Sequence, residues 1–447
     1  MRKKNFSRRR FIASVSLGSM AAMSPGVIPF IGKIGNDTGK LAILGGTPVA
    51  PGKVFPQWPY VDHAMINSIT KTIRSGIWSR IQDRTSGTVT IFEKDFAELM
   101  DAKACVSTGS GTQALSSCIE AMGISAGDEV ITSPYTDMGT ISSILTSRTL
   151  PVMADLDRES FQLDPDDIEK KITENTKAIM PVHIMGQPCN MERIMAIARK
   201  HNLPVIEDAC QAHLGEYKGK KLGTIGDAGC FSFQASKTMA CGEGGAAISN
   251  DEALMERAFT VMMNGGHRVI GTKYRMNELE GAIMLGQLTT VKERHVLRNQ
   301  NADYLTSRLR EVPGLVPQKL YPGTDSGSFH LYAMSYKKEH FNNADRNTFL
   351  SALAAEGINA SGYISNGLHK EPWTDHILDL DVYTKMFSSR RLRRYRDELN
   401  LPNCDKVCED MVMLAGSGPL IGTRADMDDI VNAIIKVYEN RDQLNLI

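Results

Sequence analysis

Short apolar segments alternate with helix-like segments over the first two thirds of this chain, and this alternation constrains the fold most. The segments that favour buried strands are Ala104–Ser107, Glu129–Thr132, Pro151–Ala154, Ala178–His183, Pro204–Ile206 and Ala246–Ser249. The segments between them that favour helices include Gly111–Met122, Asp164–Ile172, Met191–His201 and Glu252–Met262. Strands that alternate with helices predict an α/β fold, in which a mostly parallel central sheet has helices on both faces.

The pattern divides the chain into a large domain and a smaller one. Residues 40–290 contain the alternating segments and should form the large domain. Residues 291–447 should contain a linking helix and a smaller C-terminal α+β domain. A long helical connection is expected over 281–312, and the strand-like segments beyond it are Phe329–Ser335 and Gly357–Tyr363. The basic stretch Lys385–Asn400 favours a solvated helix face.

The N-terminal segment, residues 1–35, has the features of a targeting sequence. A basic start precedes an uncharged run from Phe11 to Gly32, and Ser7–Phe11 (SRRRF) resembles a twin-arginine export signal. Such a signal is an address read by a receptor, so this segment is excluded from the fold argument. Pro25 and Pro29 interrupt the run and favour a signal over a membrane tether, which stays open. We therefore expect export to the periplasm.

Charge and cysteine content exclude several classes of protein. The chain has 51 Lys and Arg against 51 Asp and Glu, whereas nucleic-acid binders and polybasic membrane binders need surplus cationic charge. Eight cysteines in 447 residues are too few for a disulfide scaffold, and no pair has CxxC spacing. We expect free, mostly buried thiols and no metal site.

Residues 205–247 are the most informative part of the sequence, because three charged residues lie there close to the ends of strands. Glu207 and Asp208 lie at the carboxyl end of one strand, the edge where open α/β sheets bind ligands. Lys237 lies between an apolar strand end and the glycine-rich turn 242–245. Burial there would disfavour the charged form and leave the amine nucleophilic. A lysine of this kind on its own is more often a surface residue.

Small and hydroxyl-bearing residues lead into the helix predicted from Gly111. The free N–H groups at a helix start favour an anion, and Ser110 and Thr112 add hydroxyl donors. By itself the pattern is also that of an ordinary N-cap. Pyridoxal phosphate needs an amine, a carboxylate facing its ring nitrogen and a phosphate-binding turn, and Lys237, Asp208 and residues 109–112 offer these three.

The motifs of this chain resemble those of the DegT/DnrJ/EryC1/StrS family of pyridoxal-phosphate aminotransferases acting on sugars. They are LAILGGTPV (41–49), TGSGTQAL (108–115), GDEVITSPYT (127–136), PVHIMGQPCNM (181–191), IEDACQAH (206–213), GCFSFQASK (229–237), GEGGA (242–246) and YRMNELEGAI (274–283). The likeness is greatest to the branch that aminates cyclitol ketones or makes aminohydroxybenzoate. It implies the type I aminotransferase fold, a homodimer with sites at its interface, a Glu or Gln donor, and a keto sugar or keto cyclitol acceptor.

The resemblance also assigns roles to individual residues. Lys237 would form the Schiff base with the cofactor and then shuttle protons, and Asp208 would keep the pyridine nitrogen protonated. Gln211 would lie near the ring oxygen of the cofactor. The phosphate contacts implied are Gly111, Thr112 and Ser232.

Two positions depart from the family pattern. Asp137 stands where relatives usually have an aromatic residue that stacks on the cofactor, and Tyr135 would point to the other side of the strand end. Lys273 stands where many relatives have an Asn that reaches the partner subunit's phosphate, and it could act there as a point charge. His183 and His213 also lie inside matching motifs, and a structural hydrogen bond is the expected role of each.

Three other classes of protein are alternatives to an aminotransferase. A sugar dehydratase on the same fold typically has His in place of the lysine, so Lys237 argues against it. An exported, non-catalytic binding or sensory protein would keep the pocket without transferring nitrogen. A sugar oxidoreductase would need G-x-G-x-x-G in its first strand–helix turn, which residues 41–50 do not provide.

Overall fold

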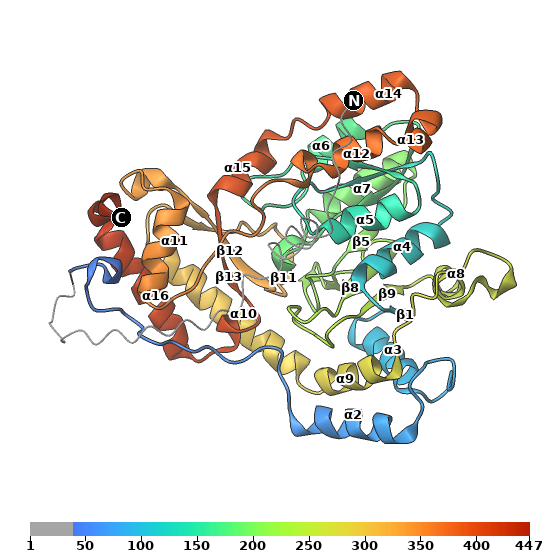
Figure 1. Cartoon of the computed structure of the whole chain (residues 1–447), viewed down its shortest axis with the longest axis horizontal. Coiled ribbons are helices and arrows are strands. Elements are labelled where there is room, and N and C mark those ends of the chain that lie inside the picture. Colours follow the sequence, from blue (N-terminus) through green and yellow to red (C-terminus); the bar gives the residue numbers. More distant parts are fainter. Residues whose placement is uncertain (1–38) are drawn as a thin grey trace, which may run out of the picture. The chain divides into compact units, whose positions relative to one another are not determined.

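A mostly parallel sheet of seven strands forms the centre of the large domain, as the sequence predicted. This computed structural model describes residues 39–447, so the twin-arginine-like motif lies outside the described part (Figure 1). The strands are β1 (Ala104–Thr108), β2 (Glu129–Thr132), β3 (Leu150–Met153), β4 (Thr176–Met180), β5 (Ile206–Asp208), β8 (Ala228–Ser232) and β9 (Gly245–Ser249). Their order is β3-β2-β4-β5-β8-β9-β1, with β4 joined to β5 by two isolated parallel bridges, and β9 runs antiparallel to both of its neighbours.

Side-chain caps fix where the helices of this domain begin. These helices are α4 (Gly111–Ala121), α5 (Met138–Thr146), α6 (Pro165–Lys171), α7 (Met191–His201) and α8 (Glu252–Met263). The residue before each helix accepts a backbone N–H from the first turn; these caps are Ser110, Asp137, Asp164, Asn190 and Asp251. Helix α4 packs on α5 and α8 and against β8 and β9, which places its N-terminus at the carboxyl edge of the sheet.

The helical connection expected over 281–312 is present and consists of two helices. Helix α9 (Glu278–Leu288) ends at Thr289, and α10 (Val291–Leu309) begins after Thr290. Thr289, Thr290 and Val291 are consecutive β-branched residues, which lose side-chain freedom in a helix and weaken it at this point. Helix α9 then packs on α2 (His63–Ser75) and α3 (Thr88–Leu99) (Figure 1).

The C-terminal region has an antiparallel sheet of its own. It contains β10 (Leu315–Pro317), β12 (Leu331–Tyr336) and β13 (Met411–Ala415), which pack with α11 (Arg346–Ala355) and α16 (Arg424–Glu439) around a second apolar core. Leu41 and Ala50 belong to this core. The predicted strand at Gly357–Tyr363 is absent: only Ser361 pairs with the sheet, at Met413, because the chain then leaves the sheet toward Tyr135 of the large domain.

Three short helices cover the edge strand β3. They are α12 (Trp373–Leu378), α13 (Asp381–Met386) and α14 (Ser389–Asp397), and α15 (Pro402–Asp410) follows them. The hydroxyl of Tyr395 donates to Pro151 O at 3.0 Å, which satisfies part of that edge. Helix α14 is mostly a solvated basic face, but Arg391 is buried and pairs with Glu129 and Glu398.

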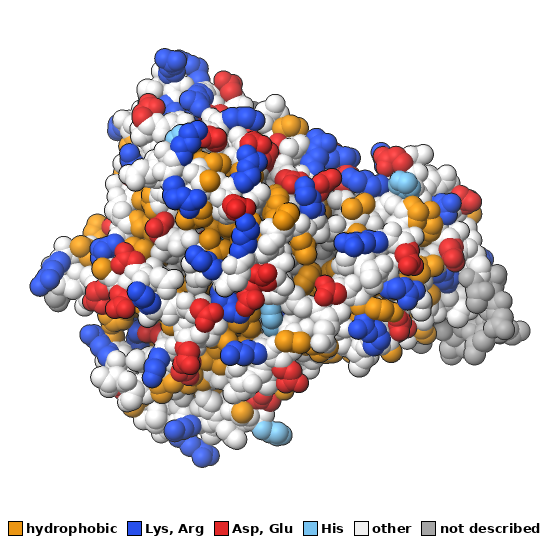
Figure 2. All heavy atoms as spheres, turned by 180° about the vertical axis from the view of Figure 1, so that it is seen from behind, with side chains coloured by type: hydrophobic (Ala, Val, Ile, Leu, Met, Phe, Trp, Pro, Cys, Tyr) orange, Lys and Arg blue, Asp and Glu red, His pale blue; other side chains and the backbone are white. Residues whose placement is uncertain are grey.

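The described surface carries both signs of charge. Figure 2 shows acidic and basic side chains interspersed over one face, in keeping with the zero net charge. The eight cysteines are all free thiols, and six of them are buried. Within residues 39–447, no helix combines the length and the apolar character that crossing a bilayer requires. The remaining strands form a small separate sheet: β6 (Glu216–Tyr217), β7 (Lys220–Lys221) and β11 (Thr324–Ser326).

Candidate active site

Asp208 lies at the carboxyl end of β5, and its carboxylate is only partly satisfied. The side chain is 3% exposed. Oδ2 accepts a hydrogen bond of 2.7 Å from Thr140 Oγ1 on α5, and Oδ1 accepts one of 3.2 Å from the backbone N–H of Cys210. A carboxylate has about four acceptor positions, so Asp208 keeps capacity for a further donor. This is the group that would face a protonated ring nitrogen.

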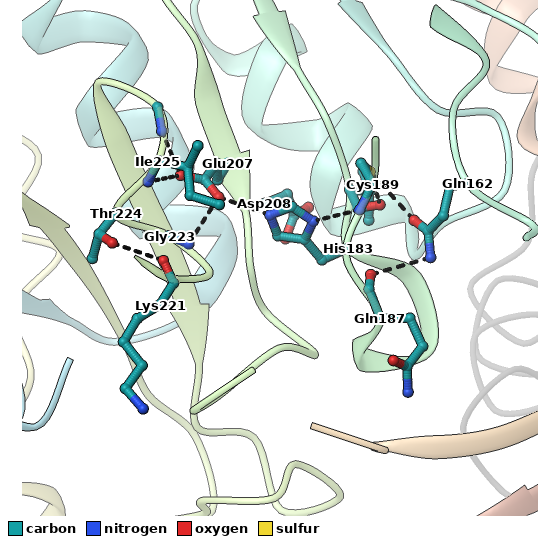
Figure 3. Close-up of polar contacts among 12 residues, drawn as sticks. Gln162, His183, Gln187, Cys189, Glu207, Asp208, Lys221, Gly223, Thr224 and Ile225 are labelled. Carbon is teal, nitrogen blue, oxygen red and sulfur yellow. Dashed lines mark hydrogen bonds and ion pairs between the residues drawn. The ribbon is translucent and has the colours of Figure 1, made fainter. Parts of the chain in front are cut away.

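Glu207, on the other face of the same strand, is fully engaged in the structure. Its carboxylate accepts the backbone N–H groups of Gly223, Ile225 and Gly226 at 2.6–2.8 Å and bonds His183 Nε2 at 2.8 Å (Figure 3). His183 Nδ1 accepts the backbone N–H of Cys189, so Nε2 carries the proton that is donated to Glu207. The predicted structural role of His183 fits these bonds.

The start of α4 forms a cradle at the same edge of the sheet. The N–H groups of Gly111 and Thr112 belong to the first helical turn and have no carbonyl partner within the helix. A Cβ at Gly111 would lie 2.7 Å from Cys210 Sγ and 2.9 Å from Ser232 Cβ, so glycine permits this close approach. The structure therefore brings the predicted phosphate contacts Gly111, Thr112 and Ser232 to one place beside Asp208.

Lys237 lies in the turn that follows β8 and is partly buried. Within residues 39–447 its amine makes no hydrogen bond or ion pair. The amine is close enough to Cys210 to counteract the rise in the pKa of that thiol, which burial causes and Asp208 increases. Lys237 and Asp208 therefore both lie near the Cys210 thiol. Free amine, buried carboxylate and helix start are the set that pyridoxal phosphate requires, so these residues fit that cofactor.

Two buried histidines, His213 and His330, lie near enough to Lys237 for its charge to lower their pKa values. Burial, together with the positive charges of Lys237 and Arg298, lowers the pKa of His213 to about 3. His213 Nδ1 contacts Thr238 Oγ1 at 3.1 Å, and its ring packs on Phe231 and Phe233. A histidine that stays neutral and packs on aromatic rings has the structural role that the sequence predicted.

Gln211 is held on both sides of its amide. Oε1 accepts the backbone N–H of Met185 at 2.7 Å, and Nε2 donates to the hydroxyl of Tyr363 at 2.9 Å. Because one N–H of Nε2 is used by Tyr363, the other is free to donate to a ligand. The contact of Gln211 with the ring oxygen of the cofactor stays a prediction.

The two residues that depart from the family pattern, Asp137 and Lys273, are both exposed. Asp137 caps α5 by accepting the backbone N–H of Gly139 at 2.8 Å, and its side chain is exposed. Tyr135 is fully buried, and its ring packs edge-on against Tyr363. Lys273 is exposed and has a φ of +57°, in the left-handed region that Asn adopts more readily than Lys. The backbone next to Lys273 reaches the predicted phosphate-binding turn, because Tyr274 O accepts the N–H of Gly109 at 3.0 Å. Contact of Lys273 itself with the cofactor stays a prediction.

Sequence reasoning missed two residues that contact this site. Thr140 donates to Asp208, and its position in the first turn of α5, after β2, was a signal for it. Tyr363 contacts Gln211 from 152 residues away along the chain, and nothing local in the sequence indicated it.

An amine and a carboxylate beside a helix start, at the carboxyl edge of an α/β sheet, define a lysine-dependent group-transfer enzyme. The profile of the DegT/DnrJ/EryC1/StrS aminotransferase family matches residues 59–434. This chain belongs to that family and is an aminotransferase.

Individual proteins agree with the family assignment. A protein of Streptoalloteichus tenebrarius, provisionally named L-glutamine:3-amino-2,3-dideoxy-scyllo-inosose aminotransferase, is 33% identical over 419 residues and covers 91% of this chain and 100% of its own length. The L-glutamine:scyllo-inosose aminotransferase of Streptomyces griseus is 31% identical and covers 90% and 98%. The crystal structure of 3-amino-5-hydroxybenzoic acid synthase has a TM-score of 0.75 at 26% identity and covers 86% and 98%. The dehydratase and non-catalytic alternatives are not favoured by these relatives.

Proposed function

We propose that this protein is a pyridoxal-phosphate-dependent aminotransferase that moves an amino group from glutamine to the ketone of a cyclitol. The observation that carries the proposal is the amine of Lys237, which has no partner among residues 39–447 and lies near the same Cys210 thiol as Asp208, together with the free first turn of α4. The names of the relatives, which specify glutamine and an inosose ketone, support this donor and acceptor for the present chain.

The residues of the site have separate tasks in this reaction. When bound, pyridoxal phosphate supplies an aldehyde and a ring that accepts electrons. Lys237 Nζ would hold the aldehyde carbon and could carry a proton to and from the substrate carbon. Asp208 would hold the proton on the ring nitrogen. The N–H groups of Gly111 and Thr112, with the Ser232 hydroxyl, would hold the phosphate.

The test is a spectrum followed by a pair of half-reactions. Purified protein loaded with pyridoxal phosphate should show a visible absorption band that glutamine bleaches and that 2-deoxy-scyllo-inosose or scyllo-inosose restores. A nucleotide-linked keto sugar should restore it poorly. Lys237→Ala should lose the band, with Lys221→Ala as a control lysine of the same domain. Protein that takes up no pyridoxal phosphate would refute the proposal, and restoration only by the nucleotide-linked sugar would refute the cyclitol acceptor.

We further propose a homodimer in which Lys273 reaches the partner subunit's phosphate site. Exposed apolar side chains on α2 and on the turn before Lys273 support it: Ile66, Ile73 and Ile270 are 48%, 50% and 81% exposed. Apolar exposure on this scale favours an interface. Light scattering should give a dimer mass, and Ile66→Glu with Ile73→Glu should give a monomer. A monomeric wild-type protein would contradict the proposal.

Export through the twin-arginine route is proposed from Ser7–Phe11 alone. Residues 1–35 fused to a folded reporter should carry it across the membrane, and Arg8→Lys with Arg9→Lys should block this transfer. Unchanged transfer in the double variant would exclude the twin-arginine route.

A further inference from the structure

We propose that Tyr363, from the C-terminal part of the chain, is a positioning residue that fixes how Gln211 presents its amide to the ring oxygen of the cofactor. This inference rests on the proposed function, because it concerns the same coenzyme site. Tyr363 would thereby have a role in the coenzyme site.

The hydrogen bonds leave Gln211 only one orientation. Met185 N–H is a donor, so the amide atom that meets it must be the oxygen Oε1. The nitrogen Nε2 then faces Tyr363, whose hydroxyl oxygen accepts from it at 2.9 Å. Without the hydroxyl, only the bond from Met185 would hold the amide, and rotation about the end of the side chain would become easier.

The phenol itself is held rigidly and remains protonated. Its ring packs edge-on against Tyr135, with 5.9 Å between centroids, and the chain before it pairs with β13 through Ser361. Burial, with the nearby carboxylate of Asp137, raises the pKa of the Tyr363 hydroxyl. Among the described residues its own hydrogen has no acceptor, so Tyr363 can accept from Gln211 and still donate to a ligand.

The position of Tyr363 also gives the C-terminal region a part in the site. Asp208, Cys210 and Asp137 all act electrostatically on its hydroxyl, so the phenol lies among the predicted cofactor contacts. A shift in the pairing of Ser361 with β13 would therefore be transmitted to Gln211 through the hydrogen bond between Gln211 and Tyr363.

The test compares two tyrosines whose rings touch. Tyr363→Phe removes the hydroxyl that bonds Gln211 and keeps the ring. Tyr135→Phe is the matched control, because its buried hydroxyl has no partner in the structure. For each holoenzyme, the dissociation constant of pyridoxal phosphate and the pH midpoint of the visible band are measured, with circular dichroism as a check on folding.

We expect Tyr363→Phe to weaken pyridoxal phosphate binding about 3- to 10-fold, the usual worth of one neutral hydrogen bond. The pH midpoint should move upward by up to about one unit, because a donor to the ring oxygen favours the deprotonated form of the bound coenzyme. Tyr135→Phe should change neither quantity more than about twofold. Gln211→Leu should reproduce both changes, and adding Tyr363→Phe to it should have little further effect.

Several outcomes separate the possible failures. Equal behaviour of Tyr363→Phe and wild type, or additive effects of the Gln211 and Tyr363 variants, would overturn this inference while the proposed function stands. If Tyr363→Phe does not fold, an unshifted pH midpoint in Gln211→Leu overturns it as well. Wild-type protein that binds no pyridoxal phosphate overturns both proposals.

Discussion

Glu207 and Asp208 are adjacent in the sequence, carry the same charge and are both buried, yet the structure uses them in opposite ways. Glu207 accepts four hydrogen bonds within the fold, from His183 and three backbone N–H groups, and has no capacity left for a ligand (Figure 3). Asp208 accepts two hydrogen bonds within the fold, so its carboxylate can accept further hydrogen bonds from a ligand. A buried carboxylate that the fold satisfies completely is structural, and one left partly unsatisfied indicates a site for a ligand.

The two buried histidines differ in the same respect, although both have structural roles. Both ring nitrogens of His183 have partners, whereas Nε2 of His213 is buried without one among residues 39–447. Four predictions test how far this distinction between satisfied and unsatisfied groups predicts function.

The largest effect is expected at the amine that the fold leaves unpaired. Lys237→Ala should lower the rate of transamination by at least about 10³-fold, because it removes both the covalent anchor and the proton carrier. The midpoint of thermal unfolding should change by a few degrees at most, since the side chain is only partly buried and unbonded. Steady-state kinetics and calorimetry check the two parts. A variant that retains a tenth of the activity would remove Lys237 from the mechanism.

Substituting each of the two carboxylates in turn should separate an effect on stability from an effect on activity. Glu207→Ala should lower the free energy of unfolding by about 3 kcal/mol or more, because it leaves His183 and three N–H groups without their acceptor. Asp208→Asn should lower the rate by about 10²-fold or more and change stability by about 1 kcal/mol at most. Denaturant titration and kinetics on both variants measure this. A stable Glu207→Ala with low specific activity would reverse the comparison.

The low pKa of His213 predicts that the stability of the protein depends on pH. His213 has a folded pKa of about 3 against a usual value of about 6.5, so between these values the unfolded state binds a proton that the folded state does not. Stability should therefore fall as the pH falls through this window, by about 1.4 kcal/mol per pH unit for the full proton. His213→Phe should remove that part of the slope in urea titrations from pH 4.5 to 7. An unchanged slope would show that His213 is protonated in the folded state.

The smallest effect is expected at the residue that supports Asp208. Thr140→Val removes the 2.7 Å hydrogen bond to Oδ2 while preserving the shape of the side chain. The rate should fall about 3- to 10-fold, in line with one hydrogen bond to a charged group at the site. Ser143→Ala, a hydroxyl on the same helix that bonds only Thr140 O, is the control and should leave the rate within about twofold. Equal rates in both variants would show that Asp208 does not depend on Thr140.

Local patterns in the sequence were sufficient for the elements and for half of the site. Strands bounded by Gly, Pro and Asp, and helices that begin at capping residues, are decided by neighbouring residues, so β1, β2, β4 and α4 could be predicted within a few residues. Asp208, which ends a strand, and Gly111, which opens a helix, were predictable for the same reason, whereas Ser232 was implied only by the family resemblance. Strand β8 was missed because Ala228–Ser232 contains small residues and no long apolar run.

Only the tertiary structure decided which of these groups have partners. Glu207 is satisfied by N–H groups from residues 223–226, and Gln211 by a hydroxyl 152 residues away, and these contacts depend on how distant segments pack. The sequence thus determined the type of chemistry at the carboxyl edge of the sheet, since it places an amine, a carboxylate and a helix start there. Packing determined which carboxylate stays free for that chemistry, because a hydrogen bond needs both groups within about 3 Å, and chain order alone does not specify that distance.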